Sequence, residues 1–134
     1  MDLAALKTQL KNFVQSMFEE DSTNPNFVEE VITLFCNDAE RIINEINRNL
    51  GYQNVDFSNL DSYVHQLKGS SSSIGANRLK LACANLRQAS DERNKEGCLQ
   101  AVQLITCEYC LLRRKFQALL HLERSIVELE TNQK

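Results

Sequence analysis

The sequence is poor in the residues that interrupt regular structure. Its 134 residues include one proline, four glycines and no tryptophan. An all-β sandwich or barrel needs a turn about every ten residues, and glycine and proline are the usual turn residues. Their scarcity argues against an all-β fold and favours long helices.

Further absences narrow the class of protein. No apolar run approaches the ~18–20 residues that cross a bilayer, and the polar N-terminal stretch lacks the apolar centre of a secretory signal. The net charge of −3 provides no basic field for a nucleic-acid backbone. The five cysteines are odd in number and irregularly spaced, which predicts reduced thiols in a cytosolic or nuclear compartment. We therefore expect one domain over residues 1–134 that binds neither nucleic acid nor membrane.

Apolar residues recur at spacings of three and four along almost the whole chain. This is the pattern of amphipathic helices, and no segment shows the alternation typical of a strand. The pattern predicts an all-α fold, an antiparallel four-helix bundle with an additional N-terminal helix. The predicted helices cover about 3–18, 25–50, 58–74, 77–92 and, after a polar turn over 91–97, a segment reaching almost to the C-terminus.

Sequence signals at the helix ends support these boundaries. Asn24 followed by Pro25 is a good start for the second helix, and Gly51 is a suitable end. Ser58 and Asp61, three residues apart, form a weak capping-box signal for the third helix. In the last helix, the predicted buried stripe comprises Leu99, Val102, Ile105, Tyr109, Leu112, Phe116, Leu119 and Ile126.

The third predicted helix carries a histidine on its polar side. At about 100° per residue, His65 lies roughly 140° from the centre of the apolar face, so we expect its ring to point into water. An idle surface histidine is the simplest alternative. The apolar face itself consists of Leu60, Val64, Leu67, Ser71 and Ile74.

The neighbours of His65 argue for a function. Gly69, one turn further on, costs a helix roughly 1 kcal/mol relative to alanine, and clearance for a partner that closes over the ring would explain it. Lys68 can reach anionic oxygens on a group attached to the ring, and Ser72 adds a hydroxyl to the same face. Asp61 could orient the ring by accepting a hydrogen bond from it.

The chemistry of an exposed imidazole points to a carrier. A neutral imidazole is a competent nucleophile, but a convex helix surface offers no oxyanion hole. Metal binding is not expected, because His121 is far along the chain and the lone Cys107–Cys110 CxxC pair cannot complete a tetrahedral zinc site. Phosphoryl transfer fits, because it depends mainly on in-line geometry and charge neutralisation. Without a glycine-rich phosphate loop, an autonomous kinase is not expected.

The run HQLKGSSSSIGA at residues 65–76 resembles the signature of plant-type histidine-containing phosphotransfer (HPt) proteins. The flanking runs NPNFV (24–28), DSYV (61–64) and LRRKF (112–116) agree, and the resemblance spans residues 24–126. It implies a four-helix bundle and a multistep phosphorelay. His65 would accept a phosphoryl group from the receiver aspartate of a hybrid histidine kinase and pass it to a response regulator.

The resemblance also implies roles for the residues around His65. Lys68 would be the positive neighbour and Gly69 the clearance residue. The further candidates for partner binding are Asp61, Gln66 and Ser72.

The same resemblance implies a carrier without enzymatic turnover or cofactor of its own, with Mg²⁺ supplied by the partner receiver domain. We expect a monomer that acts in cytokinin signalling in the cytoplasm and nucleus.

The length of the segment before NPNFV departs from the family pattern. Only residues 19–23 separate the first predicted helix from NPNFV, where family members usually have a longer segment near the docking surface. The alternative is therefore a decoy that binds receivers without relaying phosphate.

Overall fold

A computed structural model of the chain describes Thr8 and residues 27–132, with side chains described as far as Ser125. Thr8 apart, the predicted N-terminal helix lies outside this range, as do the Asn24–Pro25 start signal and the side chain of Ile126. The described elements are four helices: α2 (Phe27–Leu50), α3 (Phe57–Ile74), α4 (Asn77–Asp91) and α5 (Lys95–Asn132).

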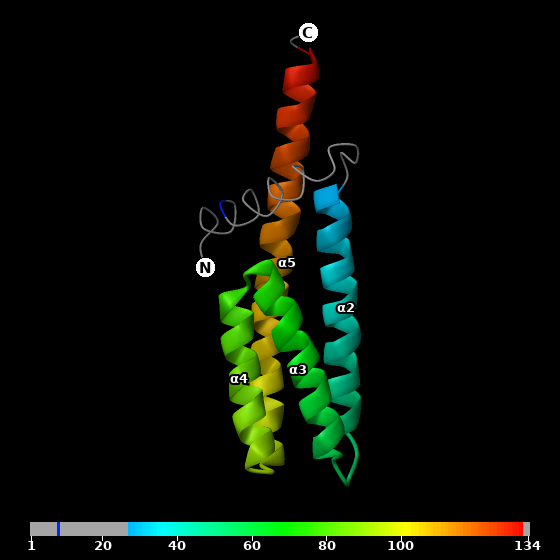
Figure 1. Cartoon of the computed structure of the whole chain (residues 1–134), viewed down its shortest axis with the longest axis vertical. Helices are drawn as coiled ribbons and strands as arrows, with labels where there is room; N and C mark the ends of the chain where they lie inside the picture. The colour runs from blue at the N-terminus through cyan, green and yellow to red at the C-terminus, as the bar shows by residue number, and fades with distance from the viewer. Residues whose placement is uncertain (1–7, 9–26, 133–134) are drawn as a thin grey trace.

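The four helices form an antiparallel bundle, which confirms the predicted fold class (Figure 1). Helix α2 packs against α3, α3 against α4, α4 against α5, and α5 against α2. Helices α3 and α5 therefore lie diagonally across the bundle. The C-terminal part of α5 extends beyond the other three described helices (Figure 1).

The apolar stripes of the four helices meet in one core. Phe116 of α5 packs edge-on against Phe35 of α2, with ring centroids 6.1 Å apart and planes at 81°, a favoured aromatic geometry. The buried hydroxyl of Tyr109 donates a hydrogen bond of 3.2 Å to the Cys36 carbonyl. These contacts hold α5 against α2.

The predicted stripe of α5 needs one correction. Leu99 is 42% exposed, while Cys98 and Ala101 are buried. Cys98 lies about 100° from Leu99 around the helix, so the core direction passes through Cys98 and leaves Leu99 at the surface. The stripe from Val102 to Leu119 is buried as predicted.

The start of α3 also differs from the prediction. Asp56, and not Ser58, is the N-cap, because its side chain accepts a hydrogen bond of 3.1 Å from the Asn59 N–H. The buried side chain of Asn49, near the end of α2, fixes the backbone of Asp56. It donates to the Asp56 carbonyl at 2.7 Å and accepts from the Asp56 N–H at 3.0 Å.

The end of α3 is as predicted. Gly75 adopts the left-handed conformation, with φ of 77°, which a glycine enters without steric cost. The following N–H of Ala76 then donates to the Ser71 carbonyl at 2.8 Å. This cap stops α3 and turns the chain into α4.

Candidate functional site

His65 lies on the outward side of α3 and is exposed, as its position on the helix predicts. Its neighbours Val64 and Leu67 are buried in the core and fix the orientation of the helix. Within the described part of the chain, the imidazole has no hydrogen bond or ion pair. The ring is therefore an accessible nucleophile rather than a packed structural residue.

Gly69 leaves bare backbone beside the ring. It is exposed, and a Cβ placed on it would meet nothing within 4 Å. The fold therefore has room for a side chain at this position and does not itself require glycine. The Gly69 carbonyl accepts a hydrogen bond of 3.0 Å from the Ser73 hydroxyl.

Lys68 lies on the side of α3 that faces α4 and is half-buried. Burial raises the pKa of the Cys83 thiol on α4 to about 12, and the positive charge of Lys68 partly opposes that rise. The charge of Lys68 therefore acts on both sides of α3, on Cys83 of α4 and one turn away toward His65. It can neutralise part of the charge on a phosphoryl group carried by the ring.

The three remaining candidates lie in different surroundings. Ser72 is exposed on the same face as His65. Gln66 makes a local contact, with its Nε2 3.5 Å from the Ser62 hydroxyl. Asp61 accepts a hydrogen bond of 2.7 Å from the Ser90 hydroxyl of α4. No hydrogen bond joins Asp61 to His65 among the described residues, so Asp61 ties α3 to α4 instead.

Sequence analysis did not find the contact between Asp61 and Ser90. The two residues are 29 positions apart, and only the packing of α3 against α4 brings them together. The sequence feature that could have indicated this contact is Ser90 itself, a small polar residue on the buried side of α4 that is 2% exposed. A buried hydroxyl requires a hydrogen-bond partner, and Asp61 supplies it.

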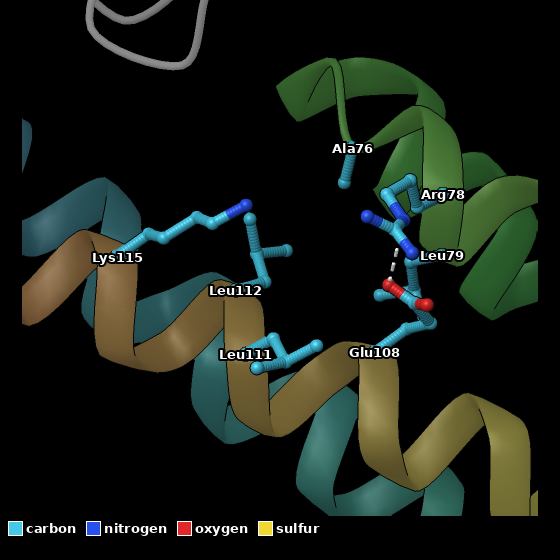
Figure 2. A pocket seen from close by; sticks show the side chains of 7 residues that line it. All are labelled: Ala76, Arg78, Leu79, Glu108, Leu111, Leu112 and Lys115. Carbon is cyan, nitrogen blue, oxygen red and sulfur yellow. Dashed lines mark ion pairs between the residues drawn. The ribbon is translucent and has the colours of Figure 1, made fainter. Parts of the chain in front are cut away.

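His65 lines none of the pockets found on the described bundle between α4 and α5, between α2 and α3 or along α5. A small pocket between α4 and α5 lies elsewhere and includes none of the candidate residues (Figure 2). Its mouth carries an ion pair of 3.2 Å between Arg78 and Glu108. Because His65 is exposed on the outward side of α3 among the described residues, a partner protein would have to supply the other wall of a reaction site there.

We also searched the described residues for a metal site, a second histidine and a membrane-spanning helix. No group of three or more histidine, cysteine, aspartate or glutamate side chains there could hold a metal ion. His121 is exposed on α5. None of the helices, within the same limits, is long and apolar enough to cross a membrane.

Comparison with known proteins decides the family. The Hpt domain family matches residues 30–128, which include His65 and most of the bundle. The chain belongs to this family. It is a histidine phosphotransfer protein of a two-component phosphorelay, and receiver domains are its partners.

The relatives of this Hpt protein include plant proteins named histidine-containing phosphotransfer proteins and others named pseudo histidine-containing phosphotransfer proteins. Histidine-containing phosphotransfer protein 1 of rice is 47% identical, over 94% of this chain and 95% of the relative. Pseudo histidine-containing phosphotransfer protein 1 of rice is 41% identical, over 91% of this chain and 66% of the relative. The crystal structure of the maize histidine-containing phosphotransfer protein ZmHP2 has a TM-score of 0.79 at 42% identity, covering 92% of this chain and 96% of the maize chain.

Proposed function

We propose that His65 is the phosphoryl acceptor of this Hpt protein. It takes the group from the receiver aspartate of a hybrid histidine kinase and passes it to the aspartate of a response regulator. The observation that carries the proposal is the accessible ring of His65 beside the bare backbone at Gly69. Because residue 69 has no side chain, a receiver pocket can approach the ring from that side.

The transfer is a displacement at phosphorus. The unprotonated Nε2 of His65 attacks the aspartyl phosphate of the donor, an N–P bond forms, and the P–O bond to the aspartate breaks. The carboxylate leaves with the bonding electrons, and the other ring nitrogen keeps its proton. Attack by the aspartate of the response regulator reverses these steps. The ammonium of Lys68 offsets part of the charge of the moving group, and Mg²⁺ bound in the receiver would supply further positive charge.

The protein acts as a carrier and has no catalytic turnover of its own, because each receiver supplies the rest of the reaction site. We place it in cytokinin-type signalling, as a monomer that acts in the cytoplasm and the nucleus. The plant relatives and the HQLKGSSSSIGA run support this placement.

Transfer of label from a phosphorylated receiver domain tests the proposal. The wild-type protein should acquire label that is stable to alkali and labile to acid. His65→Gln should abolish the transfer, while the matched variant His121→Gln should leave it unchanged because His121 lies on α5. Equal labelling of His65→Gln would show that another residue accepts the phosphoryl group.

The second candidate function is that of a non-transferring decoy. The identity to a rice pseudo histidine-containing phosphotransfer protein and the short segment at 19–23 favour it. The presence of an exposed His65 favours transfer, since a decoy has no need of a nucleophile. Receiver binding without any transfer of label would establish the decoy function.

A further inference from the structure

Helix α5 carries two exposed thiols that are not part of the face around His65. Cys107 and Cys110 are both exposed. They lie on the side of α5 opposite the core stripe through Ile105, Tyr109 and Leu112. The other three cysteines of the chain are buried: Cys36, Cys83 and Cys98.

The spacing of the two thiols suits a bridging atom better than a disulfide. Side chains three residues apart on a helix share a face, with Cβ atoms about 5–6 Å apart. A disulfide needs Cβ atoms about 3.5–4.5 Å apart, so a direct bond would distort the middle of α5. A single ion bound to both sulfur atoms spans the wider distance without that distortion.

The surroundings indicate the kind of ion. Cys107 and Cys110 line one open groove together with Leu99, Leu111 and Arg114, among others. No third histidine, cysteine, aspartate or glutamate joins them in a possible metal-binding group within the described chain. A protein zinc site with four ligands is therefore not available there. Thiolates are soft ligands that select Cu(I), and two of them satisfy this ion.

We propose that Cys107 and Cys110 together bind one Cu(I) ion. Each thiol releases one proton, two Cu–S bonds form, and copper keeps its oxidation state. The resulting bis-thiolate unit carries one negative charge. Arg114 lies one turn beyond Cys110 in the same groove and has no ion-pair partner among the described residues, so its guanidinium can offset that charge.

The copper site and the phosphotransfer face are separate. The thiols lie on the outward side of α5, and His65 lies on the outward side of α3, diagonally across the bundle. A bound ion leaves the His65 face open. Failure of the copper proposal and failure of the phosphotransfer proposal are therefore distinguishable in separate assays.

Anaerobic competition for copper tests the proposal. The reduced full chain is titrated against the coloured complex of Cu(I) with bicinchoninate, and loss of colour measures copper uptake. We expect one Cu(I) ion per chain. Cys107→Ser and Cys110→Ser should each weaken binding at least tenfold, with an unchanged helical circular dichroism spectrum because both positions are exposed.

A variant with a different spacing between the two cysteines shows whether both thiols bind the same copper ion or each binds independently. The double variant Cys110→Ser, Leu111→Cys places the second thiol four residues after Cys107, which keeps both on one helix face. It should recover most of the copper affinity that Cys110→Ser loses. Unchanged uptake by the Cys107→Ser, Cys110→Ser double variant would overturn the proposal. So would half an ion per chain with formation of a dimer, because the ligands would then come from two chains.

Discussion

At the scale of single residues, the two sides of α3 around His65 differ in function. Residues on one side are needed for the core, and we propose that residues on the other side are needed for a partner. Val64 and Leu67 serve the core and are buried. His65 and Gly69 on the other side are exposed, and neither belongs to the core that the described residues form. An exposed helical glycine in open space lowers helix stability, and the proposed clearance for a partner would explain why glycine stands at this position.

Substitution Gly69→Ala should stabilise the protein and impair transfer at the same time. The helix should gain about 1 kcal/mol in the free energy of unfolding, because the new methyl group meets nothing within 4 Å. Transfer from a phosphorylated receiver should slow roughly tenfold, since the methyl group stands where the partner has to approach. Urea unfolding and transfer of label measure the two effects.

Gly97→Ala is the contrasting control. A Cβ there would lie 2.8 Å from the Asn94 side chain, whose oxygen accepts a hydrogen bond from the Gly97 N–H. This variant should lose stability and keep the wild-type transfer rate. If Gly69→Ala transferred phosphate at the wild-type rate, the clearance role of Gly69 would be wrong.

At the scale of helices, one buried amide connects α2 to α3. Asn49 makes two hydrogen bonds to the backbone of Asp56, the residue that caps α3. These hydrogen bonds join the two ends of the loop from Gly51 to Val55, and they fix the direction in which α3 begins. That direction determines which way His65 points.

Asn49→Ala should therefore destabilise the bundle. Loss of both hydrogen bonds leaves a backbone N–H and carbonyl of Asp56 without these partners, at a cost of about 2 kcal/mol in the free energy of unfolding. Thermal or urea unfolding measures the loss. The neighbouring exposed Asn47 provides the control, because Asn47→Ala should change stability by less than about 0.5 kcal/mol. Equal effects of the two substitutions would contradict the role of Asn49.

At the scale of the whole molecule, the core contains thiols that must remain protonated. Burial raises the pKa of Cys83 from 9.0 to about 12. Burial also raises the pKa of Cys36, Cys98 and Tyr109. Each of these groups is held in its neutral form by the fold, whereas the unfolded chain can ionise it at lower pH.

The free energy of unfolding should therefore fall as the pH rises from about 9 towards 12. Over that range the unfolded chain binds fewer protons at Cys83 than the folded chain does, so alkali favours unfolding. Below pH 9 the thiol is protonated in both states, and this contribution to stability is fully present. Urea unfolding at a series of pH values measures the slope.

Cys83→Ala should flatten the alkaline decline, because it removes the titrating group with the pKa of about 12. The exposed Cys107 provides the matched control, and Cys107→Ser should leave the slope unchanged. An identical slope in Cys83→Ala and the wild-type protein would show that other groups cause the alkaline loss.

The features of the fold that depend on residues close together in the chain could be predicted from the sequence. Helix hydrogen bonds join residues four apart, so the spacing of apolar side chains alone predicts the four described helices and most of their buried faces. The same periodicity predicts an exposed His65 and a third helix that ends at residue 74, where the structure has Gly75 as the cap. The HQLKGSSSSIGA run was sufficient to indicate the family.

Packing between helices decided the rest. The choice of Asp56 over Ser58 as the cap depends on Asn49, and the partner of Asp61 is Ser90 on another helix. Whether Cys98 or Leu99 faces the core depends on how α5 is rotated against α2 and α4. These outcomes depend on distances between residues far apart in the chain. A linear pattern contains no such distances, so only the tertiary structure determines them.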